Sequence, residues 1–317
     1  MMRRDPSRVR QPAPEVRLST TAIEVTILPA HGAKITSLRH KASGREWLAQ
    51  PANPLQDPPD YGSPFTEGVM CGWDEMLPTI IACLYPAADP AHRVPLPDHG
   101  EVWALEWAVR EKTHDSVVMT VEGRVLPYRL ERRVTLAGPT MRLDYWLTVT
   151  GGEPLWLLWA AHPQFACPPG TRLVLPGAVR HLVDVTSPGK PARCAWPGGV
   201  PDRIDALRVG EGRKLYALPD APVSWAALTD SEGGWLRMSW DPAQVRYLGI
   251  WLDNHAYARE AVAALEPSTG FYDDLALAQR SGRVPHISAG PPMQWSLEVT
   301  AGQGDGPAPP PPPRSAC

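Results

Sequence analysis

Two residues that can transfer protons hold similar positions in this sequence. His162 ends the apolar stretch PLWLLWAAH, Glu266 follows the apolar run Val262–Leu265, and a proline comes directly after each of them. An apolar setting removes hydration from a carboxylate and raises its pKa, whereas histidine already titrates near neutral pH. The two residues would therefore form an acid–base pair that works near pH 7. Taken singly, His162 is more typical of a hydrogen-bonded histidine at a strand end, and Glu266 of a solvated loop carboxylate.

Other polar or aromatic side chains lie beside expected strands. His99 lies in LPDHGEVW, between a turn and a strand expected to begin at Val102. Farther along, the apolar segment YLGIWL leads directly to Asp253–Asn254–His255. The chain also has 13 tryptophans against three phenylalanines. Indole rings fill protein cores and also stack on the C–H faces of sugars, and we expect most of them here to be core residues.

Several common functional classes lack support in the sequence. There is no GxGxxG, Walker, HExxH or GxSxG motif, so nucleotide cofactors and the usual hydrolase elbows are unsupported. The net charge of −3 is well mixed and gives no reason to expect nucleic acid or a membrane surface as a partner. The five scattered cysteines form no CxxC pair, which argues against structural zinc or a disulfide framework and fits a reducing cytoplasm. The sequence shows neither a signal-peptide core nor an apolar run long enough for a membrane helix.

The elements that must position these residues are expected to be β-strands. Apolar and polar residues alternate with a period of two, and turn sequences such as GP at 138–139 separate the alternating segments. The 38 prolines argue against long helices, because a proline inside a helix costs about 3 kcal/mol. The apolar sets are Ile23–Val25–Ile27, Trp103–Leu105–Trp107–Val109, Val117–Met119–Val121, Tyr128–Leu130–Val134–Leu136, Met141–Leu143–Tyr145–Leu147–Val149, Val223–Trp225–Ala227, Leu236–Met238–Trp240 and Met293–Trp295–Leu297–Val299. The pattern predicts an all-β, antiparallel fold.

The chain is expected to form one large domain between two tails. Residues 1–14 and the proline-rich residues 302–317 are predicted to be disordered. Residues 15–301 would form the single domain. Within it, residues 50–100 and 176–215 are rich in Pro, Asp and Gly and are expected to be long irregular loops, which in a compact domain are usually functional or disordered.

Five short segments, in this order, resemble the aldose 1-epimerase (galactose mutarotase-like) superfamily. Residues 32–48, GAKITSLRHKASGREWL, resemble its opening hairpin, and residues 72–79, GWDEMLPT, resemble a loop of less-studied members. The His-Gly of LPDHGEVW resembles an element that contacts the sugar. AAHPQF resembles the motif of the catalytic histidine, and ALEPSTG resembles the segment of the catalytic glutamate. The resemblance spans most of the chain and implies a β-supersandwich.

The resemblance also implies a reaction, the interconversion of the anomers of a free aldose without metal or organic cofactor. Glu266 would accept the proton of the C1 hydroxyl and His162 would donate a proton to the ring oxygen, so that the ring opens, the C1–C2 bond rotates and the ring closes again. We expect a monomer or a homodimer in the cytoplasm. The residues expected to bind the sugar are His99, Asp74, Glu75, Trp73, Trp251, Asp253 and Asn254.

The sequence departs from the family pattern in the parts that recognise substrate. Sugar-phosphate epimerases of the superfamily carry Arg shortly after the His-Gly element, where this chain has Glu101 and Trp103. A phosphate dianion requires Arg or Lys, so a non-phosphorylated sugar is favoured. Arg93 is a candidate for the arginine that galactose mutarotases carry ahead of this element. Asp205 and Asp253 compete with Asp74, which we favour, for their substrate-binding aspartate.

Three other functions fit the same residues. A non-catalytic carbohydrate-binding protein would use the same scaffold without turnover. An isomerase or lyase of another sugar derivative, such as a uronate or a ketose, would fit the GWDEMLPT segment and the missing arginine. A β-sandwich adaptor that works through the proline-rich tail has the least support.

Overall fold

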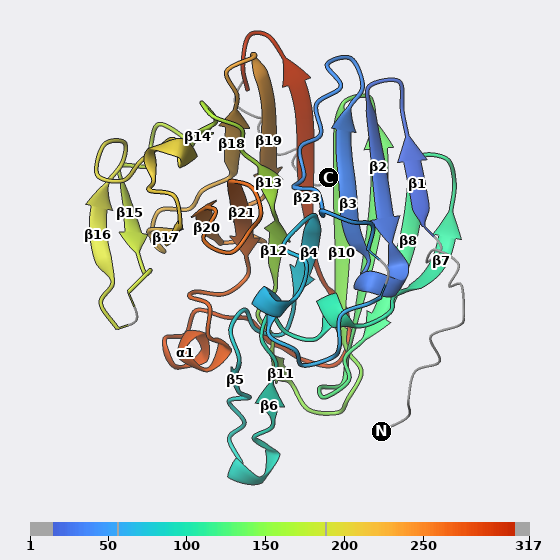
Figure 1. Cartoon of the computed structure of the whole chain (residues 1–317). Helices are drawn as coiled ribbons and strands as arrows, with labels where there is room; N and C mark the ends of the chain where they lie inside the picture. Colours follow the sequence, from blue (N-terminus) through green and yellow to red (C-terminus); the bar gives the residue numbers. More distant parts are fainter. Residues whose placement is uncertain (1–14, 56, 188, 308–317) are drawn as a thin grey trace.

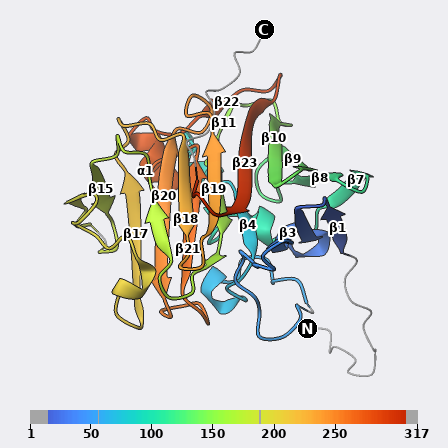
Figure 2. The same cartoon turned by 90° about the horizontal axis from the view of Figure 1, so that it is seen from above.

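Two antiparallel β-sheets dominate the computed structural model, which describes residues 15–307 except 56 and 188 (Figure 1). The larger sheet has 11 strands and the smaller has eight, and Figure 2 shows the same arrangement from above. The all-β, antiparallel prediction is confirmed. The predicted N-terminal tail and residues 308–317 of the predicted C-terminal tail lie outside the described residues.

The strands of the two sheets follow in their spatial order. The larger sheet runs through β1 (Val16–Ser19), β2 (Ile23–Leu28), β3 (Lys34–His40), β4 (Trp73–Met76), β12 (Ala160–Pro163), β21 (Val262–Ser268), β20 (Tyr247–Asn254), β17 (Glu211–Ala217), β15 (His181–Asp184) and β16 (Ala192–Ala195), with β13 (Phe165–Ala166) beside β21. The smaller sheet runs through β14 (Arg172–Val174), β18 (Trp225–Thr229), β19 (Gly234–Trp240), β23 (Met293–Gln303), β10 (Thr140–Val149), β9 (Tyr128–Ala137), β8 (Ser116–Glu122) and β7 (Ala108–Lys112).

Short elements complete the described structure. Two further strand pairs are β5 (Cys83–Leu84) with β6 (Pro95–Leu96) and β11 (Leu155–Trp156) with β22 (His286–Ile287). The helical segments are α1 (Leu275–Arg280) and the 3₁₀ turns η1 (Pro29–His31), η2 (Phe65–Glu67), η3 (Pro90–His92), η4 (Val102–Ala104) and η5 (Ile204–Ala206). No helix in the described part of the chain is long and apolar enough to cross a membrane.

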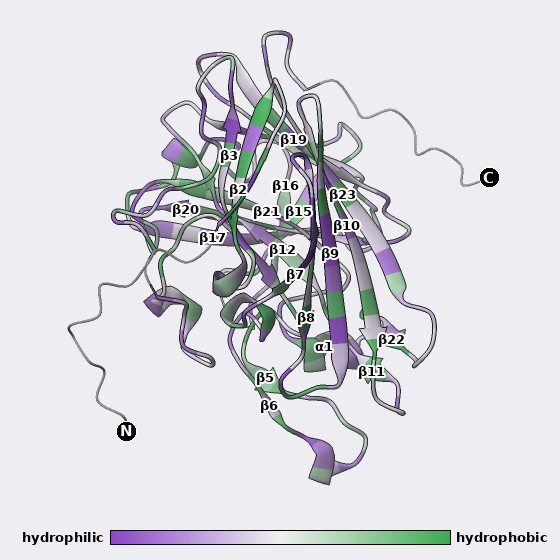
Figure 3. Ribbon diagram, turned by 90° about the vertical axis from the view of Figure 1, so that its right-hand side faces the viewer, coloured by the Kyte–Doolittle hydropathy of each residue, from purple (hydrophilic) through white to green (hydrophobic). Residues whose placement is uncertain are grey.

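The core lies between the two sheets. Strands β9, β10 and β23 alternate buried and more exposed residues along their length, and Figure 3 shows the matching change of hydropathy. Their registers align apolar side chains, since Leu143 pairs with Val134 on one side and with Leu297 on the other. One polar residue interrupts this face, because the fully buried Arg132 of β9 reaches Glu75 of β4 in the opposite sheet.

Some expected elements differ in the structure. The segment from Trp103 to Val109 is not one strand: η4 covers Val102–Ala104, and β7 begins only at Ala108. The indoles of Trp103 and Trp107 donate hydrogen bonds to the carbonyl oxygens of Asp98 and Val102, which fixes their direction without a strand.

The boundaries of three further segments also change. The apolar stretch before His162 divides into β11 and β12, so His162 lies inside a strand, as does Glu266 in β21. The two segments expected to be irregular contain strands β4 to β6 and β15 to β17. Strand β23 continues through Gln303, so residues 302 and 303 belong to it and not to a tail.

Candidate active site

The register of the larger sheet places a row of polar residues on one face. Asp74 of β4 pairs with His162 of β12. Ala160 pairs with Ser268, and the same register places His162 opposite Glu266 of β21. Glu266 in turn pairs with Gly249 of β20. Directly opposite residues in a sheet point to the same face, so the three side chains form a continuous row.

His162 and Glu266 lie close enough together to act on one bound molecule. His162 Nδ1 lies 3.3 Å from Glu266 Oε1, and both side chains are buried. Among the described residues, neither ring nitrogen of His162 has a hydrogen-bond partner, and neither has Glu266 Oε1. Buried polar atoms without partners are uncommon in folded proteins, so this cluster has the character of a binding site.

Gly249 makes room for Glu266. A Cβ atom at Gly249 would lie 3.1 Å from Glu266 Oε2 and 3.2 Å from the ring of Tyr216. Contacts this short are tighter than ordinary packing, so a side chain at this position would press on the carboxylate. The glycine therefore leaves room for the carboxylate beside the tyrosine ring.

His99 approaches the pair from a loop whose backbone conformation is unusual. His99 and Gly100 both have positive φ, of 58° and 72°. A Cβ atom at Gly100 would lie 2.2 Å from the carbonyl oxygen of Leu77, so only glycine fits there. The ring of His99 lies 5.2 Å from that of His162, centroid to centroid, in an edge-to-face arrangement. The turn thus delivers His99 to the same site.

The surroundings of His99 keep its ring neutral and fixed. Burial lowers the pKa of His99, although its contact with Asp98 opposes the shift. Nδ1 lies 3.0 Å from Asp98 Oδ1 and donates to it, so Nε2 remains free to meet a ligand. Phe65 of η2 stacks on the ring at 3.9 Å and meets His162 edge-on at 5.2 Å. Phe65 therefore forms an apolar wall over both imidazoles.

Lys214 reverses the direction of the pKa shift expected for Glu266. The apolar setting predicts a raised pKa, and burial does act in that direction. The Lys214 ammonium and the contact with His162 outweigh burial and lower the pKa of Glu266 to about 2. Lys214 Nζ contacts Glu266 Oε2 directly and lies 3.3 Å from Asp273 Oδ1. The carboxylate is therefore ionised across the physiological pH range, and the sequence contained no local signal that β17 would supply this cation.

A cavity of about 390 Å³ opens beside Lys214. Trp251 lines it together with Asp273 and the exposed Tyr257. A Cβ atom at Gly212 would lie 2.6 Å from the Trp251 indole, so this glycine lets the ring lie against β17. Trp251, predicted from the sequence to contact a ligand, therefore lines a cavity beside Lys214, the residue that contacts Glu266.

The other end of the row holds Asp74 and Gln164. Asp74 Oδ2 contacts Lys34 Nζ, whereas Oδ1 is buried and has no partner among the described residues. Gln164 follows His162 by two residues in the same register, so it shares the face of His162. Its amide is fully buried and likewise has no hydrogen-bond partner among the described residues. Sequence reasoning missed Gln164, although its i, i+2 spacing from His162 in AAHPQF was a usable signal.

Two residues predicted to bind a ligand lie on the opposite face of β4. Glu75 points into the core, where Arg132, Tyr145 and Trp159 donate hydrogen bonds to its carboxylate. Trp73 is fully buried on the same face and packs edge-on against Phe165. The structure does not bring either residue to the site, because successive residues of a strand point to opposite faces.

Asp253 and Asn254 of the predicted binding set serve the backbone instead. The carboxylate of Asp253 accepts hydrogen bonds from the backbone N–H groups of Ala256, Tyr257 and Ala258. The amide of Asn254 donates to the carbonyl oxygen of Leu207. Both side chains therefore hold the loop and turn next to β20, away from the polar row.

The remaining candidates from the sequence also have partners outside the site. Glu101 accepts hydrogen bonds from Tyr61, Tyr128 and two backbone N–H groups. Arg93 donates to the carbonyl oxygen of Ala87, and Asp205 pairs with Arg203. The arginine expected ahead of the His-Gly element is therefore not supplied by Arg93 in this arrangement.

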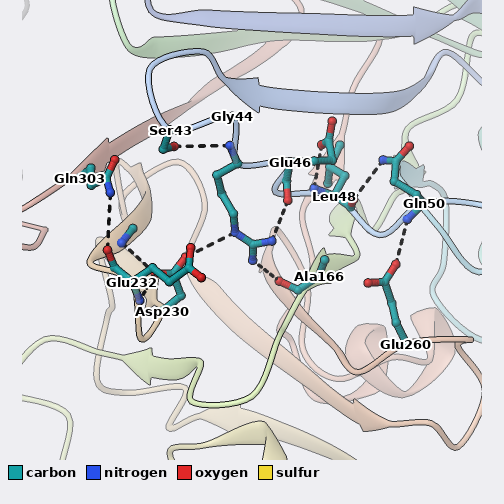
Figure 4. Close-up of a pocket in the computed structure, with 12 residues that line it drawn as sticks. Ser43, Gly44, Glu46, Leu48, Gln50, Ala166, Asp230, Glu232, Glu260 and Gln303 are labelled. Carbon is teal, nitrogen blue, oxygen red and sulfur yellow. Dashed lines mark hydrogen bonds and ion pairs between the residues drawn. The ribbon is translucent and has the colours of Figure 1, made fainter.

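A second hollow lies around Arg45 (Figure 4) and has a volume of about 440 Å³. Arg45 donates to the carbonyl oxygens of Glu46 and Ala166, and its Nε lies 3.4 Å from Asp230 Oδ2. Glu260 accepts a hydrogen bond from the backbone N–H of Gln50. The main charged groups of this groove thus already contact protein partners.

Comparison with known proteins shows similarity at the level of the fold. No protein-family model matches the sequence, and no curated protein matches it. Among solved structures, a protein from Synechocystis sp. PCC 6803 is 16% identical, with a TM-score of 0.75 over 95% of this chain and 100% of the other. A galactose mutarotase-like protein from Lactobacillus casei ATCC 334 is 17% identical, with a TM-score of 0.69 over 91% of this chain and 100% of the other.

A third solved structure extends the comparison. A candidate aldose 1-epimerase from Escherichia coli K12 is 15% identical, with a TM-score of 0.69 over 92% of this chain and 99% of the other. The chain is therefore structurally similar to galactose mutarotase-like and aldose 1-epimerase family proteins and has the galactose mutarotase-like fold predicted from its sequence.

Proposed function

We propose that this protein interconverts the anomers of a free aldose, with Glu266 as the base and His162 as the acid. The observation that carries the proposal is the convergence of His162, Glu266 and His99, whose rings and carboxylate meet on one sheet face. The hydroxyls and ring oxygen of a pyranose could satisfy the buried atoms there that lack protein partners. A fold shared with mutarotase-like proteins supports the same activity.

The proposed reaction uses the two groups in turn. Glu266 Oε1 takes the proton of the C1 hydroxyl while His162 gives a proton to the ring oxygen, and the C1–O5 bond breaks. Rotation about C1–C2 and the reverse transfers give the other anomer. Each transfer of this type contributes about 10²–10⁴-fold. His99 Nε2 holds a neighbouring hydroxyl and so keeps the reacting atoms in line.

The charges around the row favour a sugar without a phosphate group. Lys34 contacts Asp74, and Lys214 contacts both Glu266 and Asp273. The two cations are therefore matched or outnumbered by carboxylates, and Asp98 adds another beside His99. A phosphate dianion would meet net negative charge, whereas hydroxyl groups can donate to the carboxylates.

Polarimetry of freshly dissolved sugars tests the assignment. Glu266→Gln and His162→Ala should each lower the accelerated mutarotation rate by about 10²–10⁴-fold while the far-ultraviolet circular dichroism stays unchanged. Glu260→Gln, in the Arg45 groove, is the matched control and should retain the parental rate. Parental rates in Glu266→Gln or His162→Ala would rule out this acid–base pair.

One observation favours a second function, sugar binding without turnover. The contact of Lys214 with Glu266 holds the carboxylate in its ionised form and weakens it as a base. A non-catalytic protein would bind the same sugar and show no acceleration in polarimetry. Calorimetric titration of the sugars used in polarimetry separates the two functions, because only the enzyme combines binding with turnover.

A further inference from the structure

We propose that Lys214 is a positioning residue that holds one oxygen of Glu266 so that the other faces His162 in the ionised state. The inference rests on the proposed function, in which Glu266 acts as the base. It concerns a residue on β17, a strand that carries none of the residues assigned from the sequence.

The two oxygens of Glu266 have different neighbours. Oε2 contacts Lys214 Nζ, and Oε1 lies 3.3 Å from His162 Nδ1. Because a carboxylate is planar, fixing Oε2 also fixes the direction of Oε1. Without Lys214, Oε2 would be left beside Gly249 and the Tyr216 ring with no cation to hold it. Lys214 thus determines which oxygen is free to meet a substrate.

Lys214 is itself held in place. Its Nζ lies 3.3 Å from Asp273 Oδ1, and the same oxygen accepts a hydrogen bond from the Tyr216 hydroxyl. The Lys214 side chain is 13% exposed, and the residue lines the cavity beside Trp251. A cation fixed by two carboxylates cannot swing away from Glu266 without breaking both contacts.

The charged and titratable groups around Glu266 come from four strands and two loop segments. They are His162 on β12, Lys214 and Tyr216 on β17, Asp74 on β4 with its partner Lys34 on β3, Asp273 before α1, and His99 before η4. Of the two lysines among these, Lys214 is the one that contacts Glu266 directly. Its loss would leave a buried carboxylate near Asp273, and both burial and like charge raise a carboxylate pKa.

The pH dependence of mutarotation tests the inference. In the parent, Glu266 has a pKa of about 2, so its base form should persist down to the acid limit of folding. In Lys214→Met the acidic limb of kcat/KM should move upward by about 1–3 pH units, because a neighbouring cation lowers a carboxylate pKa by that amount. Lys214→Arg keeps the cation and should return the limb toward the parental position. An unmoved limb in Lys214→Met would overturn the inference.

A measurement without activity separates this inference from the proposed function. In protein labelled with ¹³C at glutamate carboxyls, with the Glu266 signal assigned by its loss in Glu266→Gln, the parental signal should not titrate between pH 4 and 8. In Lys214→Met the titration should move upward by about 1–3 pH units, toward and into the lower part of that range. A parental titration there would overturn the inference even if Lys214→Met failed to fold. The expected titrations without any mutarotation would support the role of Lys214 and reject the proposed function instead.

Discussion

Two adjacent carboxylates on opposite faces of strand β4 differ in their hydrogen bonding. Glu75 points into the core, and both of its oxygens accept hydrogen bonds from Arg132, Tyr145 or Trp159. Asp74 points to the other face, where Oδ1 lacks a partner among the described residues. Both side chains are fully buried. Burial alone therefore does not distinguish the two carboxylates, whereas their hydrogen bonding does.

The polar groups of the two faces also differ in what they can still do. Burial raises the pKa of Glu75 although Arg132 opposes the shift, and three side chains already donate hydrogen bonds to its oxygens. On the other face, His162 Nε2, Asp74 Oδ1 and the Gln164 amide have no hydrogen-bond partner within the described structure, and His162 Nδ1 has only its 3.3 Å contact with Glu266 Oε1. The polar side chains of the inner face hydrogen-bond to one another, whereas those of the outer face keep groups that a ligand could hydrogen-bond.

The largest expected effect comes from breaking the inner network. Arg132→Met removes the cation and leaves Glu75 buried without its charge partner, which should lower the free energy of unfolding by about 3–5 kcal/mol. Urea denaturation followed by tryptophan fluorescence measures the loss. Tyr145→Phe, which removes a single donor to Glu75, is the matched control and should cost less. A loss under 1 kcal/mol in Arg132→Met would show that the inner pair does not hold the sheets together.

A smaller effect of a different kind is expected on the outer face. Gln164→Ala removes an amide without protein partners, so it should weaken sugar binding by about 1–3 kcal/mol. Its free energy of unfolding should change little, since no hydrogen bond within the described structure is lost. Calorimetric titration of the sugar, with urea denaturation in parallel, gives both values. Unchanged affinity with a large loss of stability would place Gln164 with the inner face.

Much of the fold was accessible from the sequence because burial on one side leaves a period of two. Strands β9, β10 and β23 are long and regular, and their apolar residues alternate as the pairing requires. The segment from Trp103 to Val109 has the same alternation, yet it forms a turn and an exposed edge strand. Its indoles are fixed by hydrogen bonds to the local backbone, a contact that a hydropathy pattern does not record.

Only part of the candidate site could be predicted from the sequence. His99, His162 and Glu266 were predicted from short motifs; the register of β12 with β21 brings the last two together, and the turn at His99 adds the third. Lys214 had no motif, because its role depends on the pairing of β17 with β20, far from the other residues in sequence. The assignment of Glu75 failed because a strand alternates its faces, and the sequence alone did not show which of Asp74 and Glu75 points inward.

The smallest effect should come from the groove around Arg45, which is the larger of the two hollows described. Glu260→Gln retains an oxygen that can accept from the backbone N–H of Gln50, so sugar affinity and the free energy of unfolding should each change by no more than about 0.5 kcal/mol. The measurements made on Gln164→Ala serve here too. A loss of affinity as large as that of Gln164→Ala would place the sugar in the groove. It would also show that hollow size, and not unmet hydrogen bonding, marks the binding site of this protein.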